Sequence, residues 1–137
     1  MTCRERAGQV RKRYEEILTT GAGVVAIGTG GKRYAQAFIK DESVPFPVLL
    51  DEGGTAAEIV GTRAISTMAL LSPAQVRAGT RALLAGNVQH KYGRRPKQLG
   101  ASLIIAPKNV LLYEDYEDFA GDHADLDEII SVLSRAP

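Results

Sequence analysis

Residues 23–28, with the sequence Gly-Val-Val-Ala-Ile-Gly, form a short apolar run that is rich in β-branched side chains and bounded by glycines. A run of this kind is typical of a buried strand in a parallel sheet. The glycine-rich residues 28–31 follow it as a turn. Residues 32–40 then place apolar side chains at helical spacing, namely Tyr34, Ala35, Phe38 and Ile39. A strand that leads directly into a helix indicates the α/β class.

An amphipathic helix is predicted before this strand, up to residue 20. Its apolar side chains recur at intervals of three and four residues: Val10, Tyr14, Ile17 and Leu18. Gly21 then ends it. A parallel sheet built from crossover connections normally opens with a strand, and no strand precedes this helix. The sequence therefore departs from a regular α/β pattern at its front.

Further elements are predicted downstream. A strand entered through prolines is expected at residues 45–51, a short helix at 55–60 and a longer helix from 73 to about 84. The strands of a hairpin are expected at 102–106 and 110–114. Asp125 followed by Glu128 is a capping box for a last helix. The helices between strands favour a parallel arrangement, and the hairpin adds an antiparallel edge. We expect an α/β fold with a mixed sheet flanked by helices.

The totals favour an ordinary globular protein. The chain has 137 residues, enough for one domain over residues 1–137, and its 17 basic and 16 acidic side chains leave a net charge of +1. This balance gives no reason to expect nucleic acid or an anionic membrane as a partner. No apolar run approaches the roughly 20 residues of a membrane span. The charged N-terminus lacks the apolar core of a signal peptide, so we expect a cytoplasmic location.

Cys3 is the only cysteine, so the chain cannot form an internal disulfide. It lies beside Arg4 at the start of the first predicted helix, where backbone N–H groups and cationic neighbours favour a thiolate. The alternatives are a small buried hydrophobe and an inert thiol at a frayed terminus. Cys3 is therefore the candidate reactive residue, with Arg4 as a candidate electrostatic helper.

Three other patterns carry weaker functional interpretations. The turn at residues 28–32 fails the phosphate-binding loop pattern, because Ala26 and Arg33 stand where glycine and a hydroxyl residue belong. His123 lies among aspartates that crowd a helix start, where capping explains them. The basic residues 94–97 are interpreted as solvated loop charge rather than an anion site. We therefore expect neither a cofactor nor a metal.

With these elements placed, the sequence resembles the peroxiredoxin-like branch of the alkyl hydroperoxide reductase/thiol-specific antioxidant superfamily. The matching segments run in family order along nearly the whole chain: Cys3-Arg4-Glu5, residues 23–28, 45–51 and 98–101, and Tyr113 leading to Ala120-Gly121-Asp122-His123. The resemblance implies a thioredoxin-like fold. It also implies thiol-dependent reduction of peroxides, with a peroxide as substrate and a thiol as reductant.

The resemblance further implies that Cys3 matches the second cysteine of a Cys-x-x-Cys motif. The first cysteine of the motif would stand one position before Met1, after a strand that ends in the active-site turn. The N-terminus is thus expected to be truncated, and peroxide turnover to be impaired, because one thiol cannot close an internal disulfide. The alternative is a non-enzymatic binding module.

The strand that this resemblance implies would lie centrally, between the strands at residues 24–27 and 102–106. Without it, these two strands would stand about 9.6 Å apart, twice the usual spacing. Their facing N–H and C=O groups would lose partners, which is costly when they are buried. Either the gap closes, another chain fills it, or the fold is marginally stable. We expect aggregation or self-association through the open sheet.

Overall fold

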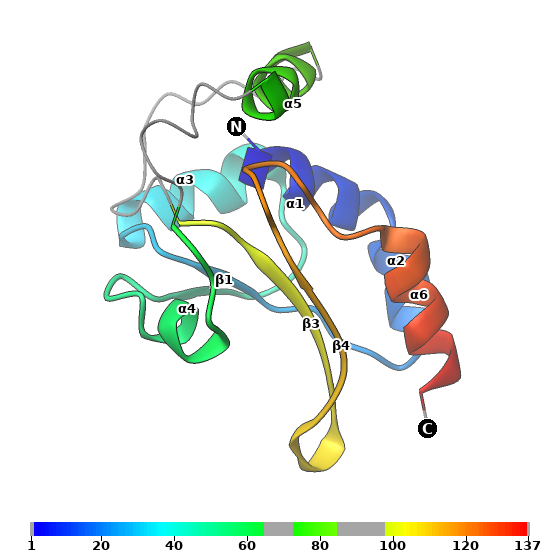
Figure 1. The fold of residues 1–137 in the computed structure, drawn as a ribbon. Coiled ribbons are helices and arrows are strands. Elements are labelled where there is room, and N and C mark those ends of the chain that lie inside the picture. Colours follow the sequence, from blue (N-terminus) through cyan, green and yellow to red (C-terminus); the bar gives the residue numbers. More distant parts are fainter. Residues whose placement is uncertain (1, 65–72, 85–97, 137) are drawn as a thin grey trace.

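The computed structural model describes residues 2–64, 73–84 and 98–136 of the chain. Its elements in chain order are α1 (Thr2–Lys12), α2 (Tyr14–Thr19), β1 (Ala26–Gly28), α3 (Lys32–Glu42), β2 (Val48–Leu50), α4 (Thr55–Val60), α5 (Pro73–Leu84), β3 (Ala101–Ala106), a 3₁₀ turn (Pro107–Asn109), β4 (Val110–Tyr116) and α6 (Leu126–Arg135). Helices surround a small amount of sheet, and the β3–β4 hairpin extends away from them (Figure 1). The predicted α/β class is confirmed.

Several element boundaries differ from the sequence prediction; the strand predicted at residues 45–51, for example, spans only Val48–Leu50. The first helix is broken at Arg13, whose backbone angles are not helical (φ −109°, ψ 10°) and whose side chain pairs with Glu16 of α2 and with Asp127 of α6. Strand β1 begins at Ala26 rather than at residue 24, because its hydrogen bonds to the neighbouring strand begin where Ala26 N donates to the Pro47 carbonyl at 2.9 Å. Prolines at 45 and 47 have no N–H to extend that ladder further back.

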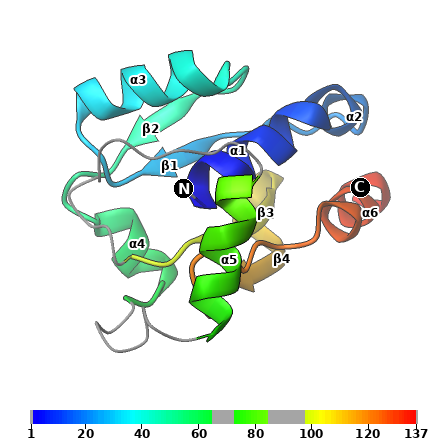
Figure 2. The same cartoon turned by 90° about the horizontal axis from the view of Figure 1, so that it is seen from above.

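The strands form two separate sheets of two strands each. Strands β1 and β2 are parallel, with Ala26 opposite Val48, and β3 and β4 are antiparallel, with Ser102 opposite Asp115. No pairing joins β1 to β3 among the described strands. Seen from above, the four strands follow the order β2, β1, β3, β4, so that β1 and β3 are the inner pair (Figure 2).

Helix α1 connects the two sheets. Its Ala7 is buried in a cluster with Val44 and Phe46, which precede β2. Its Arg6 reaches the other sheet, where Nη2 lies 3.5 Å from the Ser102 hydroxyl of β3, and its Nη1 donates to the carbonyl of Ala124, in the loop after β4, at 2.8 Å. Because α1 makes contacts on both sides, its position depends on both halves of the molecule.

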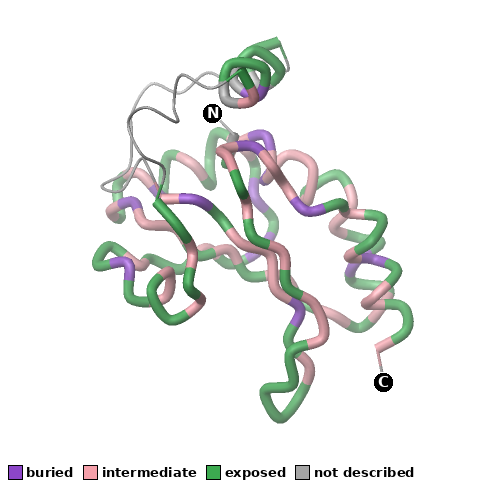
Figure 3. Tube along the Cα trace, viewed as in Figure 1, coloured by how far each residue is buried: buried purple, intermediate pink, exposed green. Residues whose placement is uncertain are grey.

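The core is thin. Few positions are buried, and no large side chain of the described residues is completely buried (Figure 3). Apolar side chains on the strands remain open to solvent, with exposed fractions of 56% for Val25, 58% for Ile27 and 61% for Ile105. Such exposure is unusual for sheet residues of an α/β fold, whose strands are normally covered on both faces.

The last helix begins where the sequence predicts. The Asp125 carboxylate accepts a hydrogen bond from Asp127 N at 2.8 Å, which caps α6. Glu128 accepts a hydrogen bond from the Tyr113 hydroxyl of β4 at 3.1 Å and so anchors the helix to the hairpin. None of the helices in the described ranges combines the length and the apolar character that crossing a membrane requires.

Candidate functional site

Cys3 lies in the first turn of α1 and is exposed. The N–H groups of a first helical turn have no partners within the helix, and together with the helix dipole they favour an anion. The predicted location of Cys3 at a helix start is therefore confirmed, whereas its redox role stays a prediction.

Tyr34 of α3 is one side chain on which the charge of Cys3 acts. Burial of the phenol raises the pKa of Tyr34, and the nearby Cys3 charge raises it further, while Arg4 lowers it. The same ring packs on Gly30, two residues past the end of β1, so closely that a Cβ at Gly30 would lie 2.5 Å from Tyr34 Cδ1. Cys3 thus acts electrostatically on a side chain that packs beside the turn after β1.

Arg4 is bound to the C-terminal end of α3. Its Nη1 lies 2.7 Å from Glu42 Oε1, its Nη2 lies 3.3 Å from Asp41 Oδ2, and its guanidinium stands 6.0 Å from the centre of the Phe38 ring. Burial opposes the charge of Arg4, but the hydrogen bonds to the two carboxylates outweigh it and raise the pKa. Most of the Arg4 charge is therefore compensated within the protein.

One donor of this side chain is not engaged. The Arg4 Nε–H is buried and has no hydrogen-bond partner among the described residues. Arg4 thus holds α1 against α3, and its Nε–H can still donate one further hydrogen bond. Its predicted help to the thiolate is compatible with this placement and stays a prediction.

A second ion pair on α1 was not foreseen from the sequence. Glu5, two residues after Cys3, is the only buried charged residue in the described part of the chain, and its Oε1 accepts from Arg81 Nε of α5 at 2.8 Å. Arg81 Nη2 also donates to the Gly121 carbonyl at 2.7 Å. Nothing in the sequence distinguishes Arg81 from Arg77 on the same helix, because the pairing depends on how α5 packs against α1.

The histidine considered as a metal ligand has another partner. His123 Nδ1 lies 2.6 Å from Glu117 Oε1, and the other oxygen of Glu117 accepts from Gly100 N at 3.0 Å. Asp122 Oδ2 accepts from Asp118 N at 3.1 Å. No group of three metal-ligating side chains occurs among residues 2–64, 73–84 and 98–136. These side chains hold the loop between β4 and α6, and the basic residues 94–97 lie outside the described residues.

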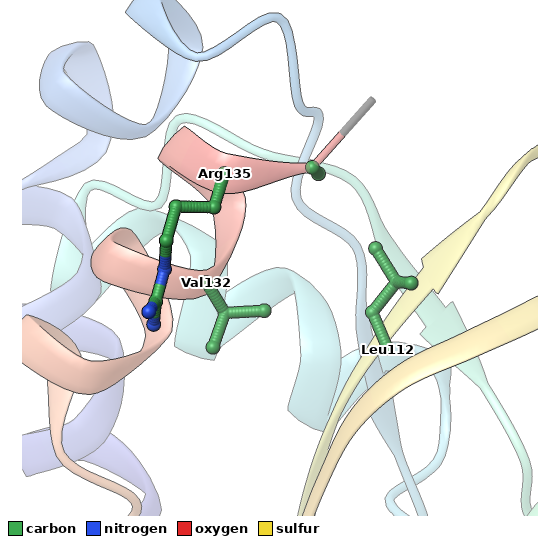
Figure 4. Close-up of a pocket in the computed structure, with 4 residues that line it drawn as sticks. Leu112, Val132 and Arg135 are labelled. Carbon is green, nitrogen blue, oxygen red and sulfur yellow. The ribbon is translucent and has the colours of Figure 1, made fainter.

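A hollow in the protein surface lies away from Cys3. It has a volume of about 200 Å³ and is lined by Leu112 of β4 and by Val132, Arg135 and Ala136 at the end of α6 (Figure 4). It adjoins the C-terminus, at the opposite end of the molecule from the start of α1 (Figure 1). The hollow is therefore not part of the Cys3 site.

Comparison with known proteins gives one match. The family model described as AhpC/TSA antioxidant enzyme matches residues 9–118, which is most of the chain, although Cys3, Arg4 and Glu5 lie before the matched range. No curated protein and no solved structure matches the chain. The helix and strand order agrees with the thioredoxin-like fold of that family. The chain therefore belongs to the AhpC/TSA antioxidant enzyme family.

Proposed function

We propose that the protein is a peroxiredoxin-like thiol redox protein in which Cys3 is the reacting group. The observation that carries the proposal is the position of this thiol, exposed in the first turn of α1. In the reaction, the Cys3 thiolate attacks the terminal oxygen of a hydroperoxide and the O–O bond breaks. Cys3 becomes a sulfenic acid, and the alkoxide leaves as an alcohol after taking a proton.

Regeneration of the thiol depends on an external reductant. A small thiol attacks the sulfenic acid to give a mixed disulfide and water, and a second thiol then releases Cys3 and a small-molecule disulfide. Cys3 is the only cysteine of the chain, so both steps are intermolecular and the cycle is slow. The cytosol, with its pool of reduced thiols, is the compartment that suits this chemistry.

The proposal is tested by peroxide consumption in the presence of glutathione, comparing the wild-type chain with Cys3→Ser. We expect the wild type to consume hydrogen peroxide faster and to form a dimedone adduct at Cys3. Ser134→Cys provides a matched control in the Cys3→Ser background, because it restores one thiol near the end of α6, away from the site. Equal rates for the wild type and Cys3→Ser would remove the enzymatic proposal.

A second candidate function is binding of an extended strand between the two sheets. Ala26 N donates to Pro47 and the Gly28 carbonyl accepts from Asp51, so the N–H and C=O of Ile27 between them point toward the opposite edge of β1. No described strand pairs with that edge. Exposed apolar side chains on both sheets, such as Ile27 and Ile105, favour an apolar strand as occupant.

We propose a second copy of this chain as the source of that strand. Sedimentation over a range of protein concentrations should show dimers in the wild type. Ile27→Lys should shift the chain to monomers, because a charge on an open strand edge opposes strand addition. Ile59→Lys is the matched control, since Ile59 is 82% exposed on α4. A wild-type monomer with a cooperative, concentration-independent melt would contradict this second proposal.

A further inference from the structure

Arg81 joins three segments that are distant in the sequence. Its Nε and Nη2 lie 2.8 and 3.4 Å from the two carboxylate oxygens of Glu5 on α1, and Nη2 donates to the Gly121 carbonyl at 2.7 Å. The Arg81 guanidinium therefore connects α5, the first turn of α1 and the loop between β4 and α6. A planar group with donors on several sides can bind a carboxylate and a carbonyl together, which an ammonium does less well.

The packing around this connection is close. Ala78, one helical turn before Arg81, is only 2% exposed, and α5 contacts α1 along this side. Glu5 is 8% exposed, whereas Arg81 is 53% exposed, so the carboxylate is the buried partner. A buried carboxylate needs a compensating charge, and Arg81 supplies it.

The loop that Arg81 reaches is also held by α1 itself. Arg6, next to Glu5, donates to the Ala124 carbonyl at 2.8 Å, three residues after the Gly121 carbonyl that Arg81 holds. Gly121 is buried and has φ +93°, a conformation that other residues adopt only with strain. The N-terminal half of α1 and this loop are thus joined by two arginines, Arg6 of α1 itself and Arg81 of α5.

We infer that Arg81 is a positioning residue for the Cys3 thiol, and this inference rests on the proposed function of Cys3. By holding Glu5 and Gly121, Arg81 keeps the first turn of α1, which carries Cys3, in its helical conformation. Loss of the bridge frays that turn, which removes the stabilisation that a helix start gives an anion. Arg81 does not touch the reacting atoms and acts only through α1.

The test measures the rate at which iodoacetamide alkylates Cys3 as a function of pH in the full chain, with unfolding in urea measured in parallel. In Arg81→Met, alkylation should be about two- to fivefold slower near neutral pH, the range expected from losing a helix-start interaction, and its midpoint should move to higher pH. Arg77→Met is the matched control. It removes the same charge from an exposed position on the same helix and should alkylate like the wild type.

The double variant Glu5→Gln with Arg81→Met separates positioning from stability. It removes the uncompensated buried charge, so its urea midpoint should recover toward the wild type, while its alkylation should remain slow because the bridge to Gly121 is still missing. This variant also decides the question if Arg81→Met alone fails to fold. Recovery of both stability and alkylation in the double variant would overturn the inference.

The outcomes distinguish this inference from the proposed function. If wild-type Cys3 alkylates with the pH dependence of glutathione, the thiol is not activated, and both the proposed function and the inference fail. If the Cys3 thiol is activated in the wild type and equally activated in Arg81→Met, only the inference about Arg81 fails.

Discussion

Replacing Arg4 with methionine tests how α1 is held against α3. The Arg4 side chain is 11% exposed and lies 2.7 Å from Glu42, itself 17% exposed, so this hydrogen bond between charged groups contributes about 1.5–3 kcal/mol. Asp41 is 53% exposed, and solvent limits its contribution to under about 1 kcal/mol. The contact with the Phe38 ring adds about 0.5–1 kcal/mol.

Methionine keeps part of the apolar stem, which offsets some of this loss. We therefore expect Arg4→Met to lower the free energy of unfolding by about 2–3 kcal/mol. Urea unfolding followed by far-UV circular dichroism measures this change. A double-mutant cycle with Glu42→Gln should give a coupling energy of at least about 1 kcal/mol, because the two side chains form one interaction.

Arg11→Met is the matched control for this experiment. Arg11 lies two turns further along α1 and donates to the backbone carbonyl of Glu42 at 2.7 Å from an exposed position. Its loss should cost under about 1 kcal/mol. A cost below about 0.5 kcal/mol for Arg4→Met, the range of ordinary surface substitutions, would refute the reasoning.

The same variant also tests the predicted help of Arg4 to the thiolate. If the Arg4 Nε–H stabilises the Cys3 anion, Cys3 is alkylated more slowly in folded Arg4→Met than in the folded wild type. If Arg4 only holds α1 against α3, alkylation of the folded protein stays at the wild-type rate. The ratio of the two rates, measured at a urea concentration where both proteins are folded, decides between the two roles.

Three further predictions concern other parts of the molecule. Gly30→Ala should destabilise the protein by about 1–3 kcal/mol in urea unfolding, because the new methyl group displaces the Tyr34 ring, whereas Gly28→Ala, with open space around its Cβ, should cost less than about 1 kcal/mol. Asp115→Asn should raise the free energy of unfolding at neutral pH by up to about 1 kcal/mol, because burial, followed by neighbouring carboxylates, raises the pKa of Asp115 and disfavours its charge; a destabilised variant would contradict this. Burial, with a hydrogen bond to a carboxylate, raises the pKa of Tyr113 to about 12, so the folded state keeps a proton that the unfolded state loses from about pH 10. Stability should therefore fall as pH rises from about 10 to about 12, and replacing Tyr113 with phenylalanine should flatten this part of the profile.

Most elements of the fold follow from local patterns in the sequence. The apolar run before Gly28 predicts β1, the spacing of Ala35 and Phe38 predicts α3, and Asp125 marks the start of α6. These signals depend on neighbouring residues, so the sequence contains them directly. Some boundaries were not predicted in this way, such as the break of the first helix at Arg13.

The candidate site was predicted only in part, for a related reason. The position of Cys3 at a helix start is a local property and could be expected from the sequence. The electrostatic effect of Cys3 on Tyr34, and the bridge from Glu5 to Arg81, join residues separated by dozens of positions. No periodicity encodes such pairs, because they depend on how complete helices pack.

The sequence by itself determined the order of helices and strands, the single thiol at the start of α1 and the family resemblance, since all three are written in local patterns and motifs. Only the tertiary structure decided which charges meet. It compensates Arg4 with Glu42, pairs Glu5 with Arg81, and leaves β1 and β3 without a common partner among the described strands. The physical reason is that burial and hydrogen bonding depend on distances in space, which the folded chain sets and separation along the sequence does not.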